Sequence, residues 1–359
     1  MSATVRHLTV HDRFAAMDDD GEEHEDNSPS GVNSDPCPCL PDEFWNARPQ
    51  HQHIRAAAHA KGTAADAVLG AFLARLSFLT NHNWLLDDVI RYSNPNIIVG
   101  LVGMSGAGKG TSMEIASRLL PYSRLTHPKH QIVNAGSGEG IPRSFYEVVA
   151  AKDDTGAEVK GKTAVELHYD NVLIDVAEGD VLVAIGKRQG STIWSVLKTG
   201  YSAEGLGFTN SAQERRFPVN RLSYRLAVCI AIQPTIAAGL LEDKDGGTPQ
   251  RITWHSMTDP SIPDIDHLPE FPGQIKWSQP DWQKAPEKRF IDGYNRSIIT
   301  IDPQIRREIL SQHLAKNRGT LHVDPMHSQR PVLLYKLGAL LALLDGRTHV
   351  EREDWDLAT

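Results

Sequence analysis

Apolar residues in the first part of the chain recur with the spacing of helices. Residues 40–45 (Leu40-Pro41-Asp42-Glu43-Phe44-Trp45) are typical of a helix start, and residues 53–59 are rich in alanine. Residues 63–79 then place apolar side chains three and four positions apart, which puts them on one face of a helix. We therefore predict an N-terminal helical segment over residues 40–92.

From residue 93 the pattern changes to short apolar runs typical of buried strands. Such runs occupy residues 96–102, 131–134, 172–176, 226–232 and 251–254. Helices are predicted between or after them at residues 112–120, 144–150, 191–201 and 235–241. This alternation favours an α/β fold with a parallel sheet over residues 93–290, in which the Pro-rich residues 258–289 form a surface connection. Residues 303–317 and 331–344 predict a C-terminal helical bundle within residues 291–359.

The charge of the chain is concentrated at its beginning. The net charge is −8, yet residues 1–43 hold eleven acidic residues against Arg6 and Arg13, and the remainder is nearly balanced, with 35 basic and 34 acidic residues. Residues 1–39 are polar and acidic with no sustained hydrophobic period, so we predict a disordered acidic tail. The balanced remainder neither requires nor excludes nucleic acid as a partner.

The apolar runs are too short for a membrane protein. None approaches the roughly 18 consecutive apolar residues that a membrane span needs, and no secretory leader pattern is visible, so we expect a cytoplasmic protein.

Cys229 lies in an apolar run and is typical of a buried small side chain. Cys37 and Cys39 form a Cys-Pro-Cys pair near His51 and His53, but no second cysteine pair completes a zinc-finger spacing.

One glycine-rich run carries the clearest chemistry. It lies between the predicted strand at 96–102 and the predicted helix at 112–120, and its residues are Gly103, Met104, Ser105, Gly106, Ala107, Gly108, Lys109, Gly110 and Thr111. Backbone N–H groups in such a loop surround an anion at a helix N-terminus, and the lysine reaches the β- and γ-phosphates. The run therefore predicts a P-loop that binds ATP.

The residues expected to manage magnesium depart from the usual pattern. Gly110 stands where Ser or Thr usually follows the lysine, and Thr111 comes one position later, near the expected α-phosphate. Asp175 ends the apolar run at 172–176 and is predicted to hold Mg²⁺ through water, the arrangement known as Walker B. We therefore name Asp175 and Thr111 as the candidate magnesium residues.

The remaining catalytic roles are assigned to four side chains. Glu178 is favoured slightly over Glu139 as the base that activates water, and both assignments stay open. Gln233 follows the strand at 226–232, where a side chain can sense the γ-phosphate. Arg251 follows a loop and can act as an arginine finger on a nucleotide held by a neighbouring subunit, with a surface ion pair as the alternative.

Several further motifs occur in one order along the chain. They are Leu40 to Trp45, Gly103 to Thr111, Gly136-Ser137-Gly138-Glu139-Gly140, Lys187-Arg188-Gln189-Gly190-Ser191-Thr192, Tyr201 to Gly207, and Gly247 to Arg251. From about residue 40 to the end, the chain resembles an uncharacterised family of phage, prophage and plasmid P-loop ATPases related to the helicase module of primase–helicases. The resemblance implies a RecA/AAA-like ATPase core, a homo-oligomeric ring, and a role in replicating mobile DNA with a primase or another replication protein as partner.

DNA contact and the type of reaction are the least determined features. Lys187, Arg188 and Ser191 are candidates for contacting the phosphates of single-stranded DNA. An ATP-driven helicase or translocase is the leading hypothesis. A nucleotide kinase is favoured by the Gly-Lys-Gly-Thr ending, and a non-hydrolysing nucleotide-binding scaffold by the lack of a glutamate directly after Asp175. The final residues are typical of a helix start, so a truncated or partner-dependent module is a further hypothesis.

Overall fold

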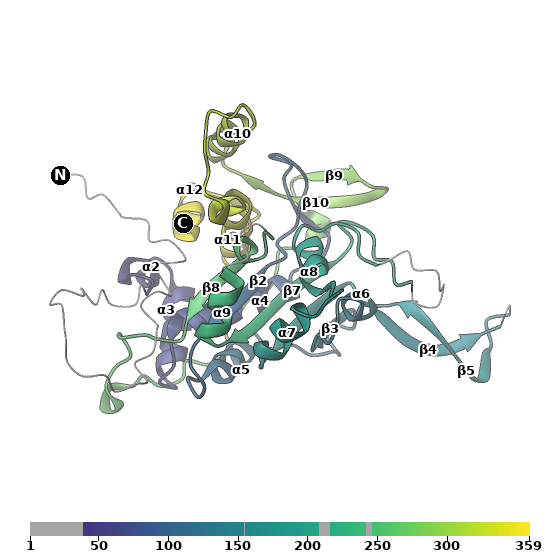
Figure 1. Ribbon diagram of the computed structural model, residues 1–359, viewed down its shortest axis with the longest axis horizontal. Coiled ribbons are helices and arrows are strands. Elements are labelled where there is room, and N and C mark those ends of the chain that lie inside the picture. Colours follow the sequence, from purple (N-terminus) through teal and green to yellow (C-terminus); the bar gives the residue numbers. More distant parts are fainter. Residues whose placement is uncertain (1–38, 154, 208–215, 242–245) are drawn as a thin grey trace.

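A five-stranded parallel sheet forms the centre of the computed structural model, which describes residues 39–153, 155–207, 216–241 and 246–359 (Figure 1). Its strands are β2 (Ile98–Val102), β3 (His130–Val133), β6 (Asn171–Val176), β7 (Arg225–Ile232) and β8 (Ile252–Ser256). They lie in the order β3-β6-β7-β2-β8, and every neighbouring pair is parallel. The sequence predicted all five strands with bounds that agree to within two residues, so the predicted parallel α/β sheet is confirmed.

Side chains alternate between two covered faces of this sheet. In β2, Ile98 and Val102 belong to one apolar cluster, whereas Val99 and Leu101 belong to another. Successive residues of a strand point to opposite faces, and both faces are covered by helices here, so the strands are apolar at nearly every position.

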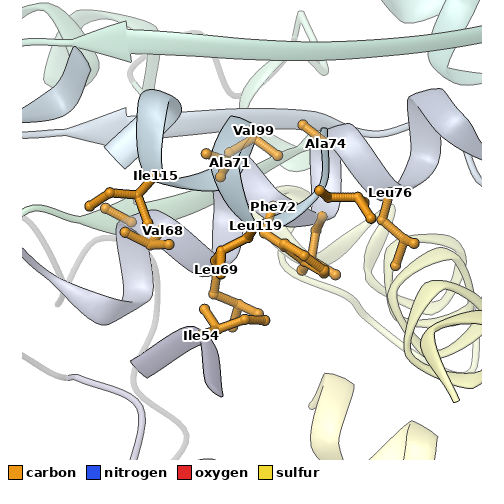
Figure 2. Packing of buried hydrophobic residues seen from close by; sticks show 14 of the residues in the cluster. Ile54, Val68, Leu69, Ala71, Phe72, Ala74, Leu76, Val99, Ile115 and Leu119 are labelled. Atoms are coloured by element: carbon orange, nitrogen blue, oxygen red, sulfur yellow. The ribbon is translucent and has the colours of Figure 1, made fainter. Parts of the chain in front are cut away.

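The N-terminal helices cover the face of the sheet that bears Val99 and Leu101. They are α2 (Asp42–Asn46), α3 (Pro49–His59) and α4 (Ala65–Leu79), and α5 (Lys109–Leu119) packs beside them. All fifteen residues of α4 are buried, because this helix lies between the sheet and its neighbouring helices. Figure 2 shows its residues Val68 and Phe72 packed near Val99 of β2 and near Ile115 and Leu119 of α5.

The second face is covered by helices that follow the sheet strands. These are α7 (Gly179–Gly186), α8 (Ile193–Tyr201) and α9 (Pro234–Leu241), and their buried residues join the cluster that contains Ile98 and Val102. The predicted helices at 191–201 and 235–241 are confirmed, whereas α7 was not predicted. A short helix, α6 (Gly140–Arg143), follows β3.

The C-terminal region is not the purely helical bundle that the sequence predicted. It contains α10 (Pro303–Asn317), α11 (Arg330–Leu344) and α12 (Arg352–Ala358), and also the strands β9 (Lys288–Ile291), β10 (Tyr294–Ile301) and β11 (His349–Val350). The strand β10 pairs in parallel with β1 (Trp84–Leu86), which precedes the central sheet. Segments from both ends of the chain thus share a second sheet, joined by the buried side chains of Trp84, Ile299 and Val350.

A separate β-hairpin replaces a predicted helix. Residues 144–150 were expected to be helical, but β4 (Tyr146–Lys152) pairs in an antiparallel manner with β5 (Glu158–Leu167) and extends away from the body (Figure 1). Val148 and Val149 favour strand because their branched side chains fit a pleated ribbon. The helix prediction was therefore wrong at this position.

The structure does not test the predicted acidic tail. Of residues 1–39 only Cys39 is described, and Cys37 lies outside the described residues. Within the described part of the chain, no helix is both long and apolar enough to cross a membrane. The domain boundaries proposed from the sequence stay predictions.

Candidate nucleotide-binding site

The glycine-rich loop connects β2 to α5 at the carboxyl edge of the central sheet. Gly106 and Gly108 have φ angles of +80° and +86°, a left-handed conformation that favours glycine. At Gly103, a Cβ atom would lie 2.5 Å from the Cβ of Met257, so only glycine fits between the loop and the segment after β8. The sequence of the loop is therefore fitted to one backbone path.

The amide groups of this loop are available to a ligand. The first amides of an α-helix have no acceptor within the helix. Among the described residues, no hydrogen-bond acceptor is found for the amides of Ser105, Gly106, Gly108, Lys109, Gly110 and Thr111. A group of N–H donors at the positive end of a helix forms an anion-binding site.

Lys109 turns back onto its own loop. Its Nζ atom donates to the carbonyl oxygens of Gly103 at 2.6 Å and Met104 at 2.8 Å. Burial lowers the pKa of Lys109, and the nearby carboxylate of Asp180 opposes this shift. The lysine side chain is thus held beside the loop amides, at the position from which a P-loop lysine reaches phosphates.

Asp175 lies beside the first turn of α5. It lines a cavity of about 420 Å³ together with Gly110, Met113 and Asn134. Its Oδ1 atom is buried and has no hydrogen-bond partner within the described residues. Burial raises the pKa of Asp175, and the buried guanidinium of Arg75 on α4 opposes the shift. The structure therefore brings the predicted Walker B acid and the phosphate loop to one cavity.

Gln233 directly follows β7, and β7 lies between β2, which leads into the phosphate loop, and β6, which carries Asp175. Its Nε2 atom donates to Oδ2 of Asp180 at 2.8 Å. Asp180 is in the first turn of α7, and the sequence analysis did not identify it. No local signal identified it, because α7 was not predicted and the bond to Gln233 forms only in the assembled sheet.

The two glutamates proposed as bases are less embedded. Glu178 and Glu139 are exposed and precede α7 and α6, respectively. Within the described residues, neither side chain has a hydrogen bond or an ion pair. Gly138 fixes the loop that holds Glu139, because a Cβ atom there would lie 2.1 Å from Oγ1 of Thr192.

Arg251 lies at the opposite edge of the sheet. It ends a short 3₁₀ helix, Pro249–Arg251, directly before Ile252, and Ile252 pairs with Ile98 at the beginning of β2. Arg251 lines a cavity of about 640 Å³ with two other cations, Arg91 and Lys198, and one carboxylate, Glu204. The guanidinium of Arg251 donates to Gly247, whereas its buried Nε atom has no partner among the described residues.

The candidate DNA contacts lie near the far end of α7. Lys187 and Arg188 are exposed and follow the last helical residue, and Ser191 is half-buried, with its amide donating to the carbonyl of Arg188. An eight-residue helix is about 12 Å long, which separates these residues from Asp180. The sequence also holds a second pair of adjacent basic residues, Arg215 and Arg216, of which Arg215 lies outside the described residues.

Comparisons with known proteins give a distant structural likeness. No family model matches the chain, and no curated protein matches it. Among solved structures, the chain is similar to a full-length MCM homolog from Methanopyrus kandleri, with 15% sequence identity and a TM-score of 0.40. The match covers 88% of this chain and 59% of that chain, so the present chain spans well under two thirds of the protein it matches.

The residues at the carboxyl edge fit a triphosphate and its metal. The loop offers N–H donors and a cation to phosphate oxygens, and Asp175 offers one carboxylate oxygen without a partner. Magnesium is usually bound by one or two carboxylates together with phosphates and water, so a single acid suffices. No cluster of three or more metal-binding side chains occurs among the described residues. Cys39, from the Cys-Pro-Cys pair, donates a hydrogen bond to the carbonyl oxygen of Thr258.

Proposed function

We propose that this chain binds and hydrolyses ATP and belongs to the helicase or translocase type of motor. The observation that carries the proposal is the loop at residues 103–111, in which six amides have no acceptor among the described residues and Gly110 lines the same cavity as Asp175, whose Oδ1 atom has no partner there either. Donors fixed before the reaction stabilise the charge that develops on the transferred phosphoryl group.

Each predicted residue has a role in this proposal. Lys109 binds the β- and γ-phosphates, Thr111 binds beside the α-phosphate, and Asp175 holds magnesium, which offsets negative charge on the phosphates. Gln233 senses the γ-phosphate from its position directly after β7, the strand between β2 and the strand of Asp175. Glu178 and Glu139 stay the sequence-based candidates for activating water.

The oligomeric and DNA-related parts of the proposal rest on fewer observations. Arg251 is on the opposite edge of the sheet from its own phosphate loop, which supports a role toward a nucleotide on a neighbouring copy in a ring. The exposure of Lys187 and Arg188 supports contact with single-stranded DNA. A role in phage or plasmid replication, with a primase or replication partner, rests on the family resemblance alone.

The test is the rate of ATP hydrolysis with and without single-stranded DNA, for the wild type and Lys109→Ala. We expect DNA to stimulate the wild type and the substitution to lower kcat/KM by about 100-fold or more. Lys284→Ala is the matched control, because this lysine side chain is 84% exposed and far from the loop in the sequence.

Three results would redirect the proposal. A rate that DNA leaves unchanged would contradict the helicase type. Transfer of phosphate to a nucleoside monophosphate would support the nucleotide kinase instead. Tight ATP binding without turnover would support a nucleotide-binding scaffold.

A further inference from the structure

Asp180 is hydrogen-bonded to one residue of the proposed ATPase site and lies at the same edge of the sheet as another. Its Oδ2 atom accepts a hydrogen bond from Nε2 of Gln233 at 2.8 Å. Asp180 is in the first turn of α7, and Lys109 is in the first turn of α5. No direct ion pair joins Asp180 and Lys109 within the described residues.

The position of these residues follows from the topology. Lys109 is in the first turn of α5 after β2, Asp180 is in the first turn of α7 after β6, and Gln233 directly follows β7, which lies between those strands. Carboxyl ends of parallel strands meet at one edge, so the three residues lie at that edge. Since a P-loop lysine reaches the β- and γ-phosphates, the γ-phosphate is expected at this edge, where the amide of Gln233 holds Asp180.

The other acids differ from Asp180 in this respect. Asp175 lines the cavity beside Gly110 and Met113, which Asp180 does not line, and is the candidate for magnesium. Glu178 and Glu139 are exposed and, within the described residues, have no polar side-chain contact that ties them to the loop. Asp180 is thus the carboxylate that a hydrogen bond connects to the sensor amide, at the edge of the sheet that holds Lys109.

We propose that Asp180 faces the γ-phosphate of bound ATP and acts as the base for the attacking water, and that the amide of Gln233 controls its position. This inference rests on the proposed ATP hydrolysis and adds a catalytic residue to it.

The chemical step is a hydrolysis at the γ-phosphorus. The water oxygen forms a bond to phosphorus, while the bond between phosphorus and the oxygen that bridges to the β-phosphate breaks. The electron pair of that bond leaves with the ADP oxygen, and one water proton moves to the carboxylate of Asp180, which later releases it to phosphate or solvent. The products are ADP and phosphate.

Gln233 gives the site a simple means of control. In this structure its Nε2 group donates to Asp180, and Lys109 donates to the carbonyls of Gly103 and Met104. The γ-phosphate offers better acceptors to both donors, because its oxygens are charged. When these donors turn to the phosphate, Oδ2 of Asp180 is released to accept a hydrogen bond from water.

The test compares Asp180→Asn with Asp180→Glu in the full chain. Asparagine keeps the size and an oxygen acceptor for Gln233, so the local fold is retained while the base is removed. We expect turnover of Asp180→Asn to fall by about 100-fold or more, and Asp180→Glu to regain at least about tenfold of that loss. Glu114→Gln, on the exposed face of α5, is the control and keeps wild-type turnover.

A binding measurement separates catalysis from a structural role. A carboxylate opposite the γ-phosphate repels ATP more than ADP, so Asp180→Asn should raise the ratio of ATP to ADP affinity by about threefold or more. Fluorescent nucleotide titration in the presence of magnesium gives both affinities. A purely structural acid would change both affinities alike.

The outcomes are distinct for the two levels of inference. Turnover of Asp180→Asn within about threefold of wild type, or an unchanged affinity ratio, would overturn the role of Asp180. Loss of turnover in Glu178→Gln or Glu139→Gln, with Asp180→Asn active, would assign the base to that glutamate. A wild type that binds ATP without hydrolysing it would refute the proposed ATPase and the proton transfer together, whereas a raised ratio would still support the placement of Asp180.

Discussion

His82 is a half-buried histidine near positively charged groups. It precedes β1, and burial together with Arg296 and Arg225 lowers its pKa to about 3. His130, at the start of β3, has its pKa lowered to about 4 by burial, by His127 and by Arg225. Oδ2 of Asp170 lies 3.8 Å from Nδ1 of His82, beyond hydrogen-bond reach, so it offsets little of this effect.

These histidines predict that the fold loses stability in mild acid. The unfolded chain protonates a histidine near pH 6.5, whereas folded His82 stays neutral down to about pH 3, so the unfolded state binds more protons between those values. The free energy of unfolding is therefore highest above pH 6.5 and falls as the pH decreases. Between pH 7 and pH 5 we expect His82 to account for about 2 kcal/mol of the loss.

Urea denaturation at pH 7 and pH 5 checks this expectation. His82→Gln should lose about 2 kcal/mol less than the wild type between the two pH values, while the exposed His267→Gln should match the wild type. An equal pH dependence in His82→Gln and the wild type would show that this histidine is protonated in the folded protein.

The residues of the site were predictable to different degrees. The loop at 103–111 and Asp175 follow from local patterns, since a strand, a glycine run and a helix are adjacent in the sequence. Asp180 carries no such motif, and its relation to Lys109 and Gln233 arises only when three strands assemble in the order that places β7 between β2 and β6. Its role in the proposed site therefore depends on tertiary contacts.

At the level of elements, a single lysine connects α11 to the central sheet. Lys336 is completely buried, and its Nζ atom donates to the carbonyl oxygens of Asn94, Asn96 and Tyr201. Its ammonium group also lies 4.2 Å from the centre of the Tyr201 ring. Three acceptors match the three donors of an ammonium group, so α11 is held to the segment before β2 and to the end of α8.

We expect Lys336→Met to destabilise the protein by about 3 kcal/mol, because three buried carbonyl groups lose their donor and regain it only in part from water. The measurement is the free energy of unfolding from urea titration. Lys316→Met on α10 is the control, because Lys316 is exposed, and it should change stability by less than about 0.5 kcal/mol. Similar stabilities for the two variants would mean that Lys336 does not anchor α11.

Elements were predictable where one local pattern dominates. The apolar runs of β2, β6 and β7 are long enough to identify buried strands. The hairpin β4–β5 was missed because Val148 pairs with Val165, far along the chain, and the intervening residues carry no strong alternation. The hairpin β9–β10 had a usable signal, the Asp292-Gly293 turn, in which both residues have positive φ angles of 49° and 83°.

On the scale of the whole molecule, the phosphate loop with Lys109 and a group of three other cations lie at opposite edges of one sheet. The phosphate loop follows β2 at the carboxyl edge, whereas Arg251, Lys198 and Arg91 line the cavity at the amino edge. A strand of five residues is about 16 Å long. One copy of the chain therefore does not bring Arg251 to its own phosphate loop, and the catalytic role proposed for Arg251 requires a second copy.

A mixing experiment tests this requirement. Lys109→Ala damages the loop and keeps the cavity, whereas Arg251→Ala keeps the loop and damages the cavity. Each variant alone should hydrolyse ATP slowly, because every interface lacks one component. In a head-to-tail assembly formed from equal amounts of both, roughly a quarter of the interfaces join an intact loop to an intact cavity. We therefore expect the mixture to regain up to about a quarter of the wild-type rate.

The control for this experiment replaces one component by a chain that cannot complement. Lys109→Ala mixed with the double variant Lys109→Ala/Arg251→Ala contains no intact loop, so its rate should stay at the level of Lys109→Ala alone. Wild-type turnover by Arg251→Ala would remove Arg251 from catalysis. A third outcome is that Arg251→Ala is slow but binds ATP normally, and that the two single variants assemble together without any gain in rate. Arg251 would then act within its own chain, and a conformational change would have to bring the two edges of the sheet together.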